Sequence, residues 1–242
     1  MGRAVASPAA DAAVGGVILV LPPGEPVSAK GASFLAHARM LPLARSLAAA
    51  GGAEGLVAHV VRYGRRGWNG TEAHLAADAR WAAEEVVQRY GDVPVCLVGH
   101  GMGGRAALRA ADHTAVNSVL AMAPWLPEDD RAAEPEPVRQ LVGRRVLIMH
   151  GTNDARTDPE LSYRLAERAK KTSRDICRFE VHSDGHALRQ HHSEVLALAS
   201  DFVLGSLLSR AYSRPVADAL AAPPPLGLRM PLAAGFGRSL RP

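Results

Sequence analysis

The chain has 242 residues, 48% of them hydrophobic, which is enough to form one α/β domain with a sizeable core. Its formal net charge of +4 lies in residues 209–242, which hold five arginines and one acidic residue, so residues 1–208 are formally neutral. A nucleic-acid-binding domain carries its basic residues on a folded face, and this charge distribution argues against that class of function.

Neither a membrane-spanning segment nor a secretory signal is predicted. No apolar run reaches the roughly 18 residues that a spanning helix needs, and Asp11 separates Arg3 from the first apolar run, at 15–21. The two cysteines, Cys96 and Cys177, lie inside apolar runs and are predicted to be buried as small hydrophobic residues rather than joined in a disulfide. We therefore expect a cytoplasmic protein with no membrane partner.

After a loose, alanine-rich leader at 1–14, β-branched apolar runs alternate with segments in which apolar residues recur at helical spacing. The predicted strands are 16–21, 55–63, 93–98, 116–122, 145–149 and 176–181. The predicted helices are 34–50, 71–90, 105–111, 158–171 and 193–208. Pro42 lies inside the first helix, so we expect its regular part to start near Leu41. Thr71 and Asp158 are expected N-caps.

This alternation predicts a mostly parallel sheet of about six strands with helices on both faces, in one α/β domain at 15–208. Residues 123–143, between the fourth strand and the fifth, are too few for a large lid. From Ser209 onward proline and alanine dominate, so we predict that residues 209–242 form a Pro/Ala/Arg-rich tail that is disordered or loosely docked.

The most informative stretch lies between the third strand and the next helix and reads Gly99-His100-Gly101-Met102-Gly103-Gly104. A strand that turns sharply into a helix through small residues is the frame of the nucleophile elbow, G-x-S-x-G. Five of the six residues match Gly-His-Ser-Met-Gly-Gly, the common elbow of the α/β-hydrolase family, which the chain resembles over about residues 14–208. The residue that differs is Gly101, which stands where the family has its nucleophilic serine.

The resemblance implies two further site residues. The loop that starts at His150 is similar to the family's His-Gly-x-x-Asp-x-x-x-x-Pro loop and puts the catalytic acid at Asp154. The loop after the sixth strand contains Gly185-His186, which puts the catalytic histidine at His186. The chain order of elbow, acid and histidine fits the family. These loops follow the carboxyl ends of parallel strands, where ligands gather in open α/β sheets.

The resemblance also implies an oxyanion hole built from two backbone N–H groups, one of them at Met102. The other lies after the first strand, where residues 22–23 are prolines without an N–H, so Gly24 or Glu25 is expected to supply it. Gly101 has no hydroxyl, so acyl transfer through a serine triad is not possible. A glycine there does relieve the backbone strain of the elbow.

Each assignment has an alternative. Asp154 can be read as a turn residue beside the following helix, and Ser183 as a substitute nucleophile that would lack the elbow. Three more histidines lie close to His186 in sequence: His182, His191 and His192. The cluster has no metal-ligand spacing, so we predict neither a metal nor a cofactor. His100 is interpreted as a packing residue and His150 as a structural residue.

Three residues after the second strand, Arg65, Arg66 and Trp68, suggest either a solvated turn or a rim that binds an anion or carboxylate. Trp125, after the fourth strand, either walls a pocket or caps the core.

Three functional hypotheses remain. In the first, the chain is a degenerate, non-hydrolytic family member that binds a small molecule or a partner. In the second, it is a cofactor-free acid–base enzyme of the lyase or epimerase type that uses His186. In the third, it is a weak hydrolase in which His186 activates water. The family label fits all three, because it follows the fold and not the site. The sequence leaves the ligand and the oligomeric state open.

Overall fold

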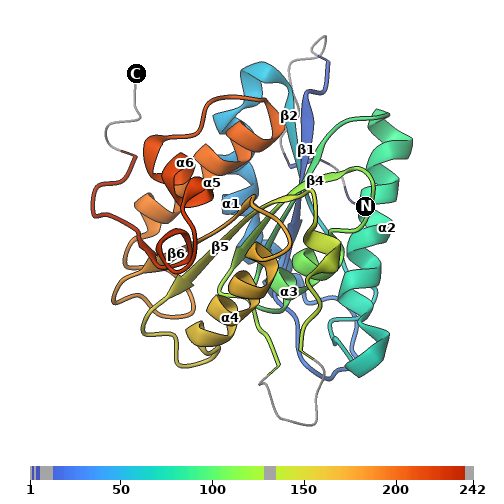
Figure 1. The fold of residues 1–242 in the computed structure, drawn as a ribbon. Helices are drawn as coiled ribbons and strands as arrows, with labels where there is room; N and C mark the ends of the chain where they lie inside the picture. Colours follow the sequence, from blue (N-terminus) through green and yellow to red (C-terminus); the bar gives the residue numbers. More distant parts are fainter. Residues whose placement is uncertain (1, 3, 6–12, 128–134, 238–242) are drawn as a thin grey trace.

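The computed structural model describes residues 2, 4–5, 13–127 and 135–237. They form a seven-stranded, parallel sheet in the order β2-β1-β3-β4-β5-β6-β7 (Figure 1). The strands are β1 (Gly16–Leu21), β2 (Leu56–Val60), β3 (Val95–His100), β4 (Val116–Met122), β5 (Arg145–Gly151), β6 (Ile176–Val181) and β7 (Met230–Pro231). All six predicted strands are present, and β1, β4 and β6 have the predicted bounds.

Helices cover both faces of the sheet, as the alternation predicts. Apolar residues of α2 (His74–Tyr90), α3 (Met102–Arg109) and α4 (Pro159–Lys170) are buried against one face. Those of α1 (Phe34–Ala50), α5 (His192–Leu207) and α6 (Arg214–Ala221) are buried against the other (Figure 1). The described residues also form the short 3₁₀ helices η1 (Gly52–Glu54), η2 (Gly70–Glu72), η3 (Arg139–Leu141) and η4 (Leu226–Leu228).

Two helix starts differ from the prediction. α1 begins at Phe34, capped by the Ser33 hydroxyl, which accepts a hydrogen bond from the Ala36 N–H at 3.2 Å, and it continues through Pro42. Tertiary packing of the helix against β2 outweighs the hydrogen bond that proline removes. α2 begins only at His74, because residues 70–72 form η2, so Thr71 is not its N-cap. Asp158 does cap α4, accepting from the Glu160 N–H at 2.8 Å.

The segment after Ser209, predicted to be disordered or loosely docked, contains α6, η4 and β7 in its described residues and packs on the domain. α6 buries Val216, and β7 adds a short edge strand that pairs with β6. Two side chains of the main domain hold the segment. Arg178 donates to the carbonyl oxygen of Leu228 at 3.0 Å, and Lys170 donates to the carbonyl oxygens of α6. The last residues, 238–242, lie outside the described part.

Cys96 and Cys177 are free and fully buried, as predicted. Burial raises the pKa of each thiol to about 12, so both stay protonated and behave as apolar side chains. Among the described residues, no helix has the length and apolar character that crossing a membrane requires.

Candidate active site

The turn from β3 into α3 is sharp and is centred on Gly101, which has φ 57° and ψ −122°. This conformation is strained for any residue other than glycine. Backbone hydrogen bonds fix the turn: the Gly101 N–H donates to Met122 at 3.0 Å, and the Gly101 carbonyl accepts from Trp125 at 3.0 Å and Arg105 at 3.2 Å. α3 begins at Met102, three residues earlier than predicted, so the helix starts directly at the turn.

The neighbouring glycines are required by close packing. A Cβ on Gly99 would collide with the carbonyl oxygen of Gly103, and a Cβ on Gly103 would collide with that of Leu21 at the end of β1. Position 101 is different. An ideal Cβ there would meet His186 Nε2 at 3.4 Å and Pro23 Cβ at 3.9 Å, which are ordinary van der Waals distances. The site therefore has room for a side chain at residue 101, beside the imidazole.

His186 is held by Asp154, so the structure brings together all three residues that the sequence assigns to the site. The Nδ1 of His186 lies 2.9 Å from Asp154 Oδ2. An ionised carboxylate only accepts hydrogen bonds, so Nδ1 carries the proton and Nε2 of the neutral ring is an acceptor. That free nitrogen is the atom that faces position 101.

Asp154 lies in a dense network of donors, and its side chain is fully buried. The Thr157 hydroxyl donates to Oδ2 at 2.6 Å, and the backbone N–H groups of Arg156 and Thr157 donate to Oδ1 at 2.8 and 3.1 Å. His150 Nε2 lies 3.2 Å from Oδ2. Burial acts to raise the pKa of Asp154, but the hydrogen bonds, first those from His150 and Thr157, outweigh it and hold that pKa well below its ordinary value. The carboxylate is therefore ionised.

Two groups fix the loop that carries His186. The carboxylate of Asp184, itself buried, accepts from the backbone N–H groups of Gly185, Arg189 and His191 at 2.9 to 3.1 Å. His100 Nε2 donates to the carbonyl oxygen of His186 at 2.8 Å. Burial lowers the pKa of His100 to about 4, so this ring is neutral at physiological pH. His100 therefore positions the His186 loop, which is more than the packing role predicted for it.

Of the three backbone N–H groups predicted for the oxyanion hole, those of Met102 and Gly24 remain candidates. Met102 is the first residue of α3, and the first N–H groups of a helix have no partner within it, so its N–H is available beside Gly101. The N–H of Glu25 donates to the carbonyl oxygen of Arg66 at 2.8 Å, which leaves Gly24 of the two predicted loop donors. Pro23, the β1-loop residue found beside position 101, has no N–H to offer.

The three residues of the predicted rim differ in exposure. Arg65 is exposed, and Arg66 is partly exposed and pairs with Glu25 at 3.1 Å. Trp68 is 3% exposed and stacks on the Arg105 guanidinium, 4.0 Å from its ring centroid. In this segment Arg65 is therefore solvent-exposed, whereas Trp68 packs in the core.

Trp125 is half-buried and lies 5.2 Å from the same guanidinium, which also pairs with the buried carboxylate of Glu136 at 2.7 Å. Arg109 binds the second oxygen of that carboxylate at 2.6 Å. These aromatic and charged groups pack behind the elbow and fix α3 to the segment that precedes β5.

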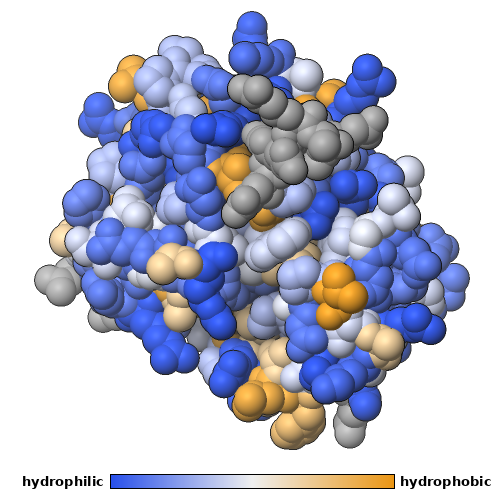
Figure 2. Space-filling view, turned by 90° about the horizontal axis from the view of Figure 1, so that it is seen from below, coloured by the Kyte–Doolittle hydropathy of each residue, from blue (hydrophilic) through white to orange (hydrophobic). Residues whose placement is uncertain are grey.

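The alternatives for the histidine cluster receive no geometric support. His182 and His192 are exposed, and no group of three metal-ligating side chains occurs among the described residues. Ser183 has φ 60°, and its N–H is bound by the hydroxyl of Thr152 at 2.9 Å. Figure 2 views the side toward which the strands point; its visible surface is mainly hydrophilic, with apolar residues in small, separate patches.

No family model matches the sequence, and none of the curated proteins matches it. Solved structures do match the fold. Xanthomonas campestris XC6422, described as an α/β serine hydrolase without a lid, aligns with a TM-score of 0.55 and 20% identity over 82% of this chain and 85% of its own. Thermogutta terrifontis esterase 2, phosphoramylated by tabun, aligns with a TM-score of 0.63 and 20% identity over 81% and 86%. The chain has the α/β-hydrolase fold.

Est1E from Butyrivibrio proteoclasticus, in its structure with ferulic acid, aligns with a TM-score of 0.61 and 15% identity over 85% of this chain and 94% of its own. At these identities the likeness concerns the α/β-hydrolase fold alone. Whether the site is active depends on its own residues.

Sequence reasoning missed Thr157, which contacts both partners of the pair: its hydroxyl is 2.6 Å from Asp154 Oδ2 and 3.2 Å from His186 Nδ1. It also missed that His150 touches Asp154. Spacing offers a partial signal, because Asp154 and Thr157 follow His150, near the end of β5, by four and seven residues. Nothing in the sequence pointed to Asp184 as the residue that fixes the histidine loop.

Proposed function

We propose that this chain is a non-hydrolytic member of the α/β-hydrolase fold that binds a small molecule or a partner group through a proton donor placed against His186. The observation that carries the proposal is the 3.4 Å between an ideal Cβ at Gly101 and His186 Nε2. A serine there would face the imidazole, and glycine leaves that place to a ligand.

The chemistry of the space defines the ligand group. In the tautomer with the proton on Nδ1, beside Asp154, Nε2 of His186 accepts a hydrogen bond, and the N–H of Met102 at the start of α3 donates one. A hydroxyl group satisfies both, because it donates through its proton and accepts through its oxygen. We therefore expect an alcohol, a phenol or an ordered water to occupy the position where a serine Oγ would stand.

Two features argue against hydrolysis of an ester by the unaltered chain. Gly101 supplies no nucleophile, so a covalent acyl-enzyme cannot form at the elbow. Pro23 faces the site without an N–H, so oxyanion stabilisation from that side is reduced. Activation of water by His186 would have to work with this incomplete hole.

The proposal is tested by titrating the protein with p-cresol while recording imidazole ¹⁵N NMR signals. We expect the His186 Nε2 signal to shift and saturate, and we expect 4-methylanisole, which lacks the donor proton, to bind about tenfold more weakly. His186→Ala should remove p-cresol binding, and His182→Ala, at an exposed histidine, should retain it. Equal binding of the two compounds would contradict the proposal.

A second candidate function is a cofactor-free acid–base enzyme. It is favoured by the ionised, fully buried Asp154 beside His186, because such a carboxylate stabilises the imidazolium that forms when His186 takes a proton. Turnover separates the candidates. If p-nitrophenyl acetate or a panel of ketones with exchangeable α-protons reacts in the presence of wild-type protein but not of His186→Ala, the enzyme interpretation replaces the binding one.

A further inference from the structure

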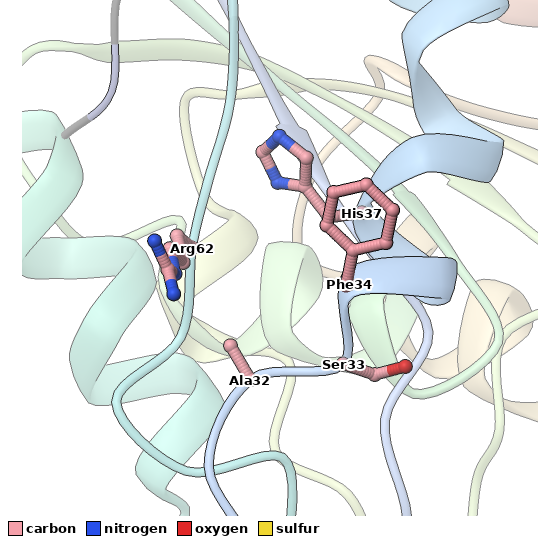
Figure 3. A pocket seen from close by; sticks show the side chains of 5 residues that line it. All are labelled: Ala32, Ser33, Phe34, His37 and Arg62. Atoms are coloured by element: carbon pink, nitrogen blue, oxygen red, sulfur yellow. The ribbon is translucent and has the colours of Figure 1, made fainter.

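A cavity lies beside the start of α1, and Gly101 does not line it. It has a volume of about 200 Å³ and is lined by Ala32, Ser33, Phe34, His37 and Arg62. Figure 3 shows Arg62, which follows β2, on one side of the cavity, and the rings of His37 and Phe34 from α1 on the other. This volume accommodates a small organic molecule.

Arg62 provides a free positive charge at this cavity. Its guanidinium has no ion pair or hydrogen bond with any described residue, in contrast to Arg66, which pairs with Glu25. An arginine fork matches the two oxygens of a carboxylate, so a free one at the wall of a cavity favours an anionic ligand.

His37 gives an independent indication of a missing partner. Its Nδ1 is buried and forms no hydrogen bond. Buried polar atoms are nearly always paired, so an unpaired one marks a place for a water or ligand atom. In Figure 3 the ring nitrogens of His37 lie on the side of the ring that faces Arg62. One ligand group can therefore contact both His37 Nδ1 and the Arg62 guanidinium.

The other lining residues, Ala32, Ser33 and Phe34, lead into α1. The Phe34 side chain is 85% exposed, and Leu35 beside it is 57% exposed, so an aromatic ring has apolar surface to contact at the rim. α1 has no acidic residue in its first turn, so the positive end of its dipole is not neutralised there.

We infer that this cavity is a binding site for a small aryl carboxylate. The carboxylate lies between Arg62 and His37, and the aromatic ring packs against Phe34. The site is separate from the one at Gly101. Gly101, Asp154 and His186 are not among the residues that line the cavity. The adjoining hollow, which Pro22 and Pro23 line together with His37 and Arg62, has a volume of about 10 Å³ and is too small for an organic group. The inference goes beyond the proposed function and does not depend on it.

The test uses benzoate and the full chain, followed by ¹H–¹⁵N NMR and isothermal titration calorimetry. We expect saturable shifts at the backbone amides of Ser33 to His37 and at Arg62. Arg62→Gln should weaken benzoate binding at least about tenfold. Arg65→Gln is the matched control, because Arg65 is an exposed arginine three residues away that does not line the cavity, and it should leave the affinity unchanged.

Two further comparisons identify the recognised groups. Benzamide, which has the ring without the charge, should bind much more weakly than benzoate, and Phe34→Ala should bring benzoate down to the affinity of acetate. His186→Ala should bind benzoate like the wild type, so failure of the Gly101 proposal and failure of this one are distinguishable. Absence of saturable shifts, equal losses in Arg62→Gln and Arg65→Gln, or a water as the only occupant of His37 Nδ1 would each overturn the inference.

Discussion

Gly101→Ser should give the protein measurable esterase activity. The ideal Cβ at residue 101 lies 3.4 Å from His186 Nε2, so a serine hydroxyl at this position can reach the imidazole. The other ring nitrogen, Nδ1, already lies 2.9 Å from Asp154 Oδ2. No backbone atom blocks the new side chain.

Two costs set the expected size of the effect. A non-glycine residue at φ 57° and ψ −122° costs roughly 1–3 kcal/mol, which lowers the melting temperature of a chain of this size by about 2–12 °C. Pro23 has no N–H, and a site in which Gly24 does not replace that donor is slower by about 10²–10³ than a complete site. We therefore expect weak but His186-dependent turnover.

The assay is hydrolysis of p-nitrophenyl acetate, with thermal melting of each variant. Gly101→Ala is the matched control: it should lose the same stability as Gly101→Ser and show no activity. Gly101→Ser with His186→Ala should also be inactive. A folded Gly101→Ser protein with no turnover above Gly101→Ala would refute the inference that His186 and Asp154 are arranged for catalysis.

Three further predictions concern stability. The folded-state pKa of Asp154 is depressed, so the contribution of its carboxylate to the free energy of unfolding is complete above the unfolded pKa of about 3.9 and is lost as the pH falls. The difference between the urea midpoints of wild type and Asp154→Asn should therefore be constant above about pH 6 and shrink as the pH falls below about 4. Ending the chain at Ser209 should lower the melting temperature by at least about 6 °C, because Val216 and Leu228 are fully buried and each contributes about 1.5–3 kcal/mol; an unchanged melt would show that the tail adds nothing. Glu136→Ala should lower the free energy of unfolding by about 3–5 kcal/mol, since it leaves the nearly buried Arg105 unpaired. Glu25→Ala, at the partly exposed Arg66 pair, should lower it by less than about 1 kcal/mol, and similar urea midpoints for the two variants would argue against a structural role for Glu136 and its two arginines.

The sheet could be predicted because its core strands are short, mostly apolar runs that alternate with segments of helical periodicity. β1, for example, is buried at all six residues, and only a strand between covered faces needs such a sequence. β7 could not be predicted, because it has two residues and includes Pro231. Its place depends on contacts of β6 and on Arg178, which are distant in sequence.

Within the site, the elbow and the two loop residues could be predicted from their resemblance to a family pattern, since the turn needs glycine at fixed positions. Asp184 could not, and the spacing of His150 and Thr157 from Asp154 is only a partial signal, because these roles depend on how two loops fold against each other. The predicted start of α2 was wrong because residues 70–72 form a 3₁₀ turn, which the helical periodicity of the segment does not distinguish from an α-helix.

The central claim is that the fold keeps its histidine and acid but has no nucleophile at Gly101, and labelling with a fluorophosphonate probe tests it most directly. The protein is incubated with the probe and mapped by peptide mass spectrometry, beside Gly101→Ser. The account predicts no labelled serine in the wild type and a single labelled residue, at position 101, in the variant. Stoichiometric labelling of the wild type at any serine, Ser183 included, would contradict it.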